Sequence, residues 1–194
     1  MGLLEDAVCA WESLCKISYT MVLGRKHTTA TIDLHFDPVD LPHICGIHYA
    51  SDVALRVNKH ECYGGKMISV VRQGKITEEE LKKSRNWSRI MGRLEAITKI
   101  EGIFDGEFQV AEFHPEHLPR NSRIVADYVI RGSSGQDIFF VFLDKEKGQY
   151  FCRSAFKYED FNYFQNQPIM KPLKITKITP AGESVIYRRP NYRE

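Results

Sequence analysis

From residue 108 onward the chain consists of short strand-like segments separated by turn residues, and this pattern restricts the fold more than any other feature. The candidate strands are residues 108–113, 123–131, 137–144, 149–156, 173–179 and 184–188. Links as short as those at residues 132–135, 145–148 and 180–182 join antiparallel neighbours. Residues 138–143 are apolar on both faces, which places them at the centre of the sheet. We therefore expect an antiparallel meander of about four to five strands over residues 107–190.

The first half of the chain has a different periodicity. Apolar residues recur at helical spacing over residues 3–15, and alternation then predicts a hairpin from residues 17–23 and 29–36. Residues 64–103 form a block of helical patterns that includes the capping-box sequence Thr77-Glu78-Glu79-Glu80. A short helix is expected where residues 158–166 interrupt the sheet. The fold class is therefore α+β, with an N-terminal helix and hairpin, a central helical block and a C-terminal antiparallel sheet.

Length and composition indicate a single globular domain over residues 1–194. The chain is 43% hydrophobic and 27% charged, and its longest apolar runs are too short to cross a bilayer. Acidic residues close to the start argue against a secretory signal. The five cysteines are odd in number and form no C-x-x-C pair, which indicates free thiols in a reducing compartment. We expect a cytoplasmic protein with no membrane partner.

Basic residues are concentrated in two segments. Residues 56–93 contain ten basic and four acidic residues, and residues 150–194 contain eight basic and four acidic ones. If the two segments meet in space they form a phosphate-binding face, and otherwise they are solvated surface.

A short segment after the hairpin carries two histidines five residues apart. His43 and His48 flank Gly46, and Asp40 is placed to cap a short helix that has Pro42 in its first turn. Because the ordinary pKa of histidine lies near neutrality, such a pair can give and take protons. Acid–base chemistry on a phosphodiester needs groups of this kind.

Several motifs occur along the chain in a fixed order. They are Phe36, the segment Leu41-Pro42-His43-Ile44-Cys45-Gly46-Ile47-His48-Tyr49 with Asp52, Gly74-Lys75-Ile76-Thr77, Ala126-Asp127-Tyr128, Tyr150-Phe151-Cys152-Arg153-Ser154-Ala155-Phe156 and Tyr163-Phe164-Gln165-Asn166-Gln167-Pro168. In this order they resemble the phage-associated nuclease-like domains of the barnase–EndoU–colicin E5/D–RelE superfamily, specifically its fourth group. Ile44 stands where the family commonly has leucine, and Pro42 before the histidine is less usual.

The resemblance implies a ribonuclease-like activity. It implies helices followed by a four-stranded antiparallel sheet, with RNA cleaved on the sheet face without a metal or another cofactor. The central helical block would then be an elaboration of that fold.

Three residues are candidates for the chemistry: His43, Ser154 and Tyr163. His43 is the first choice for the base or acid, and the alternative is a histidine that fixes the hairpin against a helix. Ser154 could bind a phosphate oxygen, or it could be a small residue that lets a helix pack closely. Tyr163 could hold a base edge or a phosphate, or it could fasten a loop.

Four further residues are candidates for substrate binding: Arg153, Lys157, Gln167 and His48. Arg153 and Lys157 could hold phosphate, or they could be solvated surface. Because side chains alternate along a strand, Arg153 and Ser154 can serve one site only if a bulge intervenes. Gln167 could bind a base edge or satisfy loop backbone, and His48 could be a ligand or a supporting surface residue.

Other motifs give little support to further chemistry. The chain has no glycine-rich phosphate loop, no H-E-x-x-H and no G-x-S-x-G. His114-Pro115-Glu116-His117 has the letters of a metal site, but it falls in an expected loop and has one carboxylate, so a turn is the default and no metal is expected.

Two functions of different classes remain open. The first is a metal-independent endoribonuclease that acts as a phage-associated or mobile-element toxin or effector, with a neutralising protein partner. It predicts a cleft in which His43 faces Ser154 or Tyr163. The second is a non-catalytic module that binds RNA or a protein. It predicts that the candidate polar groups satisfy one another and that no open pocket exists.

Overall fold

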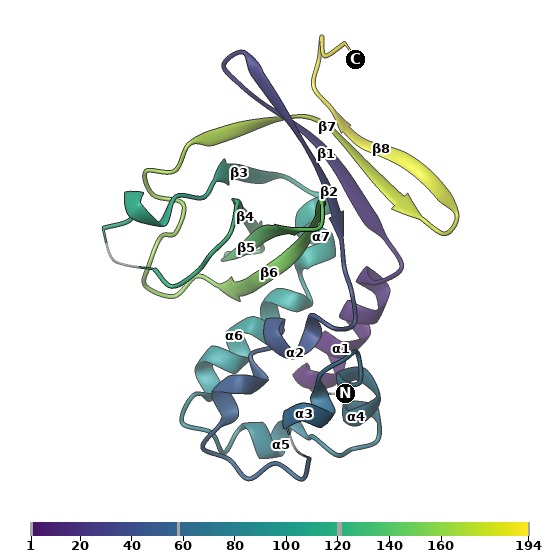
Figure 1. Cartoon of the computed structure of the whole chain (residues 1–194), viewed down its shortest axis with the longest axis vertical. Helices are drawn as coiled ribbons and strands as arrows, with labels where there is room; N and C mark the ends of the chain where they lie inside the picture. Colours follow the sequence, from purple (N-terminus) through teal and green to yellow (C-terminus); the bar gives the residue numbers. More distant parts are fainter. Residues whose placement is uncertain (1, 58, 120–121, 194) are drawn as a thin grey trace.

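The computed structural model describes residues 2–57, 59–119 and 122–193, with a strand-rich part above a helical part (Figure 1). The helices are α1 (Leu3–Leu14), α2 (Leu41–Ile44), α3 (Lys59–Cys62), α4 (Met67–Arg72), α5 (Glu78–Leu81), α6 (Trp87–Ile97) and α7 (Ile100–Asp105), with 3-10 turns η1 (Ile47–Ala50) and η2 (Pro115–His117). The strands are β1 (Ser18–Arg25), β2 (Thr28–His35), β3 (Phe108–Glu112), β4 (Tyr128–Ser134), β5 (Asp137–Glu146), β6 (Gln149–Lys157), β7 (Ile169–Thr179) and β8 (Gly182–Arg188).

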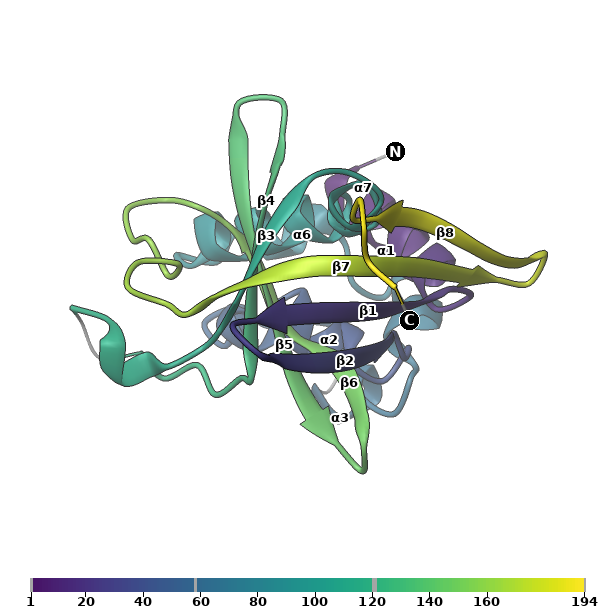
Figure 2. The same ribbon diagram turned by 90° about the horizontal axis from the view of Figure 1, so that it is seen from above.

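The strands form one sheet that closes on itself. Its order is β1-β2-β6-β5-β4-β3-β7-β8, and a further pairing of β1 with β7 closes the first seven strands of this order into a barrel. β8 pairs with β7 outside this ring. Figure 2 shows β1, β2 and β7 running side by side across the direction of β4, β5 and β6.

The prediction of a four- to five-stranded meander was therefore wrong, although the α+β class holds. The N-terminal hairpin belongs to the same sheet, because β1 pairs with β7 antiparallel and β2 pairs with β6 in parallel. Parallel contact of β2 and β6 rests on two residue pairs, Leu34 with Tyr150 and His35 with Phe151. Periodicity reveals strands but not pairings between residues more than a hundred positions apart.

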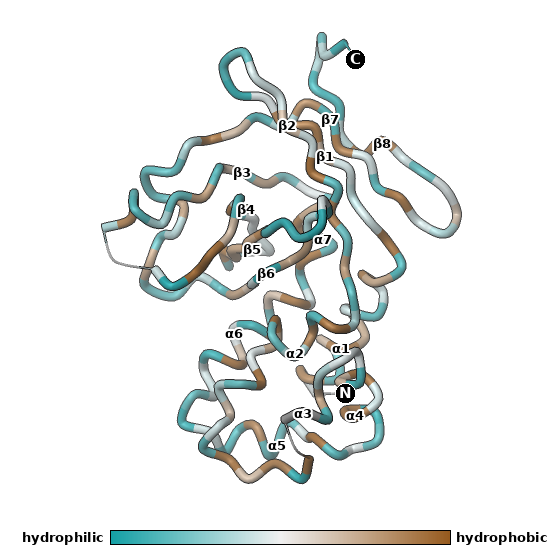
Figure 3. Tube along the Cα trace, in the orientation of Figure 1, coloured by the Kyte–Doolittle hydropathy of each residue, from teal (hydrophilic) through white to brown (hydrophobic). Residues whose placement is uncertain are grey.

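The interior of the barrel is filled from all seven strands. Each strand contributes buried side chains to one apolar cluster, among them Met21, Ile32, Val110, Ile130, Val141, Cys152 and Ile175. The cluster continues into the helical part, where α1 buries Trp11 and Leu14. Figure 3 shows hydrophobic residues recurring along the helices, while the tip of the β1–β2 hairpin is hydrophilic. The helices therefore close one end of the barrel and share its core.

A second, smaller core lies on the outer face of the sheet. Phe140 and Phe142 alternate on β5 with residues of the main core, so they point to the opposite face. Phe113, Phe164 and Tyr163 from the loops on either side cover them. The segment over residues 158–166 consists of turns and bends rather than the expected short helix, because its aromatic side chains pack down onto the sheet.

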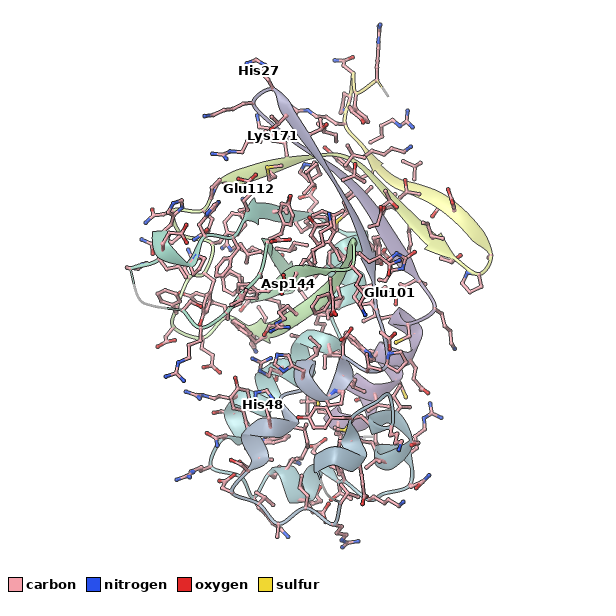
Figure 4. The ribbon with its side chains drawn as sticks, viewed as in Figure 1. His27, His48, Glu101, Glu112, Asp144 and Lys171 are labelled. Carbon is pink, nitrogen blue, oxygen red and sulfur yellow. The ribbon has the colours of Figure 1, made fainter. Side chains whose placement is uncertain are left out.

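α7 is fastened to the barrel by a partly buried polar network. The hydroxyl of Tyr19 donates to Asp105 at 2.8 Å, and the ammonium of Lys177 contacts Asp105 at 2.6 Å and Glu101 at 2.8 Å. Figure 4 labels Glu101, which lies in α7.

Within the described residues, no helix combines the length and apolarity needed to span a membrane.

The packing of α7 on β4 predicts a strong effect at Gly132. A Cβ at this position would lie 2.4 Å from Cγ2 and 3.1 Å from Cβ of Ile103, a buried β-branched side chain with little rotamer freedom in a helix. We expect Gly132→Ala to lower the free energy of unfolding by about 1–3 kcal/mol in urea denaturation.

Gly102→Ala is the matched control. Gly102 lies inside α7 and a Cβ there would meet no atom within 4 Å. Alanine at this position should raise the free energy of unfolding by about 0.5–1 kcal/mol. Equal effects of the two substitutions would contradict the described packing of α7 on the barrel.

Candidate functional site

The two histidines lie on a compact turn between the barrel and the helices. His43 is in α2 and His48 is in η1, and Gly46 joins them with a φ of +74°. A Cβ at Gly46 would lie 2.7 Å from Cδ of Arg93 and 2.9 Å from Cδ2 of Tyr49. Glycine is therefore required both for the left-handed backbone and for the close approach of these two side chains.

Arg93 is the central polar group of this region. It lies on α6 with only 9% of its surface exposed. One Nη atom donates to the carbonyl oxygen of Ile44 at 3.3 Å and to Oγ of Ser154 at 3.1 Å, and the other donates to the hydroxyl of Tyr49 at 3.4 Å. The guanidinium also lies over the rings of Tyr49 and Phe156, at 5.2 Å and 5.5 Å from their centroids.

The hydrogen-bond acceptors of Arg93 are all neutral groups in the part of the chain that the structure describes. No ion pair there involves it, and all three of its acceptors are uncharged oxygens. Burying a cation without a carboxylate is costly, and hydrogen bonds and aromatic faces recover part of that cost. A guanidinium held in this way is suited to receive an anion.

A cavity of about 360 Å³ opens beside this guanidinium. Its lining includes the basic residues Arg89, Arg93, Arg123 and Lys157, the aromatic residues Tyr49, Phe156, Phe161 and Tyr163, and the acidic residues Glu159 and Asp160. Arg89 and Arg93 come from the first basic segment of the sequence and Lys157 comes from the second. The two basic segments therefore meet at this cavity.

Structural contacts around α6 hold the cavity wall in place. Asn86, which precedes the helix, donates to the carbonyl oxygen of Tyr49 at 2.9 Å. Asp52 accepts from Oγ of Ser84 at 2.6 Å and from the backbone of Arg85 at 2.9 Å. These contacts fix the turn that bears Tyr49 against the start of the helix that bears Arg93.

The two histidine rings extend the site away from the cavity. His43 stacks on His48 with ring centroids 5.3 Å apart, and His48 lies 4.1 Å from the ring of Tyr49. Figure 4 labels His48 on the helical side of the molecule, below the barrel. Partial burial and then the positive charges of Arg93 and Arg153 lower the pKa of His43 below its ordinary value. The imidazole is therefore neutral at pH 7 and able to accept a proton.

Asp40 is a second titratable group next to the histidines, one that sequence reasoning treated only as a helix cap. Its side chain makes no capping hydrogen bond in α2. Burial, and then the charge of Asp37, raise its pKa to about 6, while Arg153 acts in the opposite direction. Asp40, at the N-cap of α2, thus has a raised pKa, while the pKa of His43 within α2 is lowered.

A bulge in β6 decides where Arg153 and Ser154 point. Phe142 pairs with Ser154 and Leu143 pairs with Cys152, so Arg153 is the extra residue. Ser154 is buried and binds Arg93, while Arg153 is exposed and lies 4.0 Å from Asp144. The positive charge of Arg153 nevertheless lowers the pKa of His43, while Ser154 binds Arg93. The bulge therefore lets both β6 residues act on the candidate site, one through His43 and the other through Arg93.

Tyr163 forms part of the cavity wall. Its ring packs edge-on against Phe142, Phe156 and Phe161, with centroids 4.7–5.5 Å apart. Burial and then the negative charge of Asp160 raise its pKa above the ordinary value. Its hydroxyl is therefore protonated at neutral pH and available as a donor.

Lys157 and Gln167 have partners within the protein. The ammonium of Lys157 pairs with Glu95 at 3.3 Å and Asp137 at 2.9 Å. The side-chain amide of Gln167 accepts from the backbone nitrogen of His114 at 2.7 Å and donates to its carbonyl oxygen at 3.1 Å. Lys157 lines the cavity with its charge largely balanced, and Gln167 joins two loops.

The predicted site residues thus differ in how close they lie to the cavity. Tyr163 and Lys157 line the cavity, Ser154 reaches it through Arg93, and the histidines reach it through Tyr49. Sequence reasoning missed Arg93 and Arg89. A signal for Arg93 was present, because an arginine three residues after Ile90 and next to Leu94 falls on the apolar stripe of a helix.

Comparison with known proteins gives one match. A family model described as phage-Barnase-EndoU-ColicinE5/D-RelE like nuclease4 matches residues 3–179, and this confirms the resemblance that the ordered motifs indicated. No curated protein and no solved structure matches the chain.

The surroundings of His43 predict its titration. We expect its midpoint in an NMR titration to lie below 6.5, the ordinary value. The folded chain then binds this proton less tightly than the unfolded chain, so the free energy of unfolding falls as the pH drops below about 6.5. Arg153→Gln should move the midpoint part of the way back, because burial and Arg93 remain.

Arg189→Gln provides the control, since Arg189 lies beyond the end of β8. It should leave the His43 midpoint unchanged. A midpoint at or above 6.5 in the native protein would contradict the described environment of the imidazole.

Proposed function

The chain belongs to the phage-Barnase-EndoU-ColicinE5/D-RelE like nuclease4 family, a phage-associated nuclease-like group, and on that premise we propose that it is a metal-independent endoribonuclease. The observation that carries the proposal is the buried Arg93 guanidinium, which faces an open cavity and has only neutral acceptors. In the proposal this group binds the scissile phosphate of RNA.

Arg93 has the geometry for this role. Two of its three hydrogen bonds, at 3.3 and 3.4 Å, are longer than the usual range for such donors, so an incoming phosphate can replace them at small cost. Phosphate would supply the negative charge that the three acceptor oxygens of Arg93 lack. Preorganised donors of this kind stabilise the additional charge that develops in the transition state.

Ser154 is a positioning residue in this scheme. Its hydroxyl accepts from Arg93 at 3.1 Å and is buried, so it holds the guanidinium rather than contacting RNA itself. The bulge at Arg153 leaves that second cation exposed near His43, where it can hold a neighbouring phosphate.

His43 and Tyr163 are the candidate proton-transfer groups, and the proposal requires RNA to place one phosphate between His43, which lies beyond Tyr49, and Tyr163, which lines the cavity. A neutral His43 takes the proton of the ribose 2′-hydroxyl, whose oxygen then attacks the phosphorus. The bond from phosphorus to the 5′-oxygen breaks, and Tyr163 donates its proton to that leaving oxygen. The products are a 2′,3′-cyclic phosphate and a free 5′-hydroxyl. The lowered pKa of His43 keeps the imidazole unprotonated before the step, and the raised pKa of Tyr163 keeps its hydroxyl protonated.

The aromatic row of His43, His48 and Tyr49 is the proposed path for unpaired bases. Single-stranded RNA is held by stacking on aromatic rings between cations. Arg89 lies 5.8 Å from the Tyr49 ring at one end of the row, and Arg153 lies near the other. Lys157 is proposed to contact the strand at the cavity rim, and Gln167 to shape the adjoining loop.

A binding module without catalysis is the second candidate. It is favoured by the internal hydrogen bonds of Ser154 and Gln167, which leave neither side chain aimed into the cavity. Its prediction that no open pocket exists is wrong, since a cavity of about 360 Å³ opens beside Arg93, and in this candidate the cavity would bind RNA or an acidic protein surface without cleaving it.

The biological setting that we propose rests on the phage-associated family and on the proposed cleavage of RNA. In this setting the chain acts as a toxin or effector on RNA in the cytoplasm. A producing cell then needs a neutralising protein, and an acidic surface covering the cavity would serve that purpose.

Cleavage of labelled RNA in EDTA tests the proposal. We expect the native protein to cut single-stranded RNA and to leave 2′,3′-cyclic phosphate ends. His43→Ala should reduce the rate at least about 100-fold, because it removes a proton-transfer group. Arg93→Lys should reduce it too, because lysine keeps the charge but loses the fork of donors.

His27→Ala is the matched control for His43→Ala. His27 lies at the tip of the β1–β2 hairpin, far from His48 in Figure 4, and its loss should leave the rate unchanged. Full activity of a folded His43→Ala protein would exclude the assigned role of His43, and loss of activity in EDTA would refute the metal-free mechanism. Saturable binding without cleavage of any RNA would favour the binding module.

The salt dependence of binding tests the phosphate contact of Arg93 separately from catalysis. With a 2′-O-methyl oligoribonucleotide, which cannot be cleaved by this route, Arg93→Gln should reduce the slope of log K against log salt by about 0.7. Arg189→Gln should change the slope less. An unchanged slope for a folded Arg93→Gln protein would show that Arg93 binds no phosphate.

A further inference from the structure

We propose that His114, Glu116 and His117 bind a divalent transition-metal ion such as zinc. The three side chains lie on and next to η2, and their donor atoms all lie within 4.8 Å of one another. The site is formed outside the cavity described above, and it does not depend on the proposed ribonuclease activity.

The donor atoms suit this class of metal. Two imidazoles and a carboxylate are ligands that zinc commonly takes, with bonds of about 2.0–2.1 Å that place neighbouring ligand atoms about 3.3 Å apart in a tetrahedral shell. Nδ1 of His114 lies 3.1 Å from Oε1 of Glu116, close to that separation. The rings of His114 and His117 stack with centroids 4.8 Å apart, so the side chains must rotate to bring a nitrogen of each ring and the carboxylate onto one ion.

A fourth residue, Glu112, lies near the ring nitrogen of His114 that faces away from Glu116. A histidine that binds zinc through one ring nitrogen usually donates its other N–H to a carboxylate, which fixes the ring. Nε2 of His114 lies 3.9 Å from Oε2 of Glu112, and that carboxylate pairs with Arg25 at 3.0 Å. If Nδ1 of His114 binds the metal, a small approach of the ring to Glu112 would let this carboxylate accept from Nε2–H.

The sequence motif alone indicated a turn, because it contains a single carboxylate. Glu112, at the end of β3, lies near Nε2 of His114. It stands outside the four-residue motif, so the motif alone does not reveal this carboxylate. The structure thus adds a carboxylate near the second ring nitrogen of His114.

The metal would have a structural effect on the cavity wall. Gln167 binds both backbone groups of His114, and Asn166 donates to the carbonyl oxygen of His117 at 3.4 Å, so the turn is joined to the loop after Tyr163. An ion on this turn would stabilise the pair of loops without placing its charge among the groups that line the cavity.

Titration of the chelator-treated, dialysed protein with zinc chloride alone tests this site. Isothermal titration calorimetry should show one ion per chain, and zinc should raise the melting temperature. His117→Ala and Glu116→Ala should each weaken binding at least tenfold and remove the thermal shift. Glu112→Gln should weaken binding about tenfold or more while keeping one ion per chain.

His35→Ala is the matched control, because His35 is exposed at the end of β2. It should bind zinc as the native protein does. The melting temperatures without metal should agree between the His117→Ala and native proteins, which separates loss of the site from loss of the fold. Absence of binding by the native protein, or native-like binding by His117→Ala, would overturn the proposal, and neither result depends on RNA cleavage.

Discussion

The candidate site depends on keeping one cation, Arg93, buried where the helices meet the barrel. The charge is held by a carbonyl oxygen, a serine hydroxyl and a tyrosine hydroxyl, which come from α2, β6 and η1. Gly46 is needed because any side chain there would collide with Arg93 and Tyr49. The α2–η1 turn and β6 are thus held around α6 by the requirement to solvate one guanidinium with neutral groups, and that requirement leaves the cation able to bind an anion.

The local elements follow closely from the sequence. The alternation over residues 17–23 and 29–36 gives β1 and β2, and the run over residues 138–143 lies in β5, between β4 and β6. The capping box at Thr77 is present, with its hydroxyl accepting from the backbone of Glu80 and the Glu80 carboxylate accepting from the backbone of Thr77. These features depend on neighbours within a few residues, and for that reason the pattern predicts them.

Closure of the sheet and composition of the site depend on distant contacts. β7 begins at Ile169, earlier than expected, and this added length lets it pair with β3 at Met170 before it runs along β1. The bulge at Arg153 breaks the alternation from which the two faces of β6 were assigned. Arg93 would have stood out as a charge on an apolar stripe, but its partners Ile44 and Ser154 are 49 and 61 residues away. No local pattern identifies such partners.

The family match and the cavity beside Arg93 both favour a site that binds nucleic acid. The family is nuclease-like and phage-associated, and the cavity beside Arg93 is where basic residues from both halves of the chain converge. The most direct test is an arginine-selective ¹⁵N NMR titration with a 2′-O-methyl dinucleotide that contains one phosphodiester. The account predicts that the side-chain N–H signal of Arg93 shifts and saturates while that of Arg189 does not move. Saturable binding that leaves the Arg93 signal in place would contradict it.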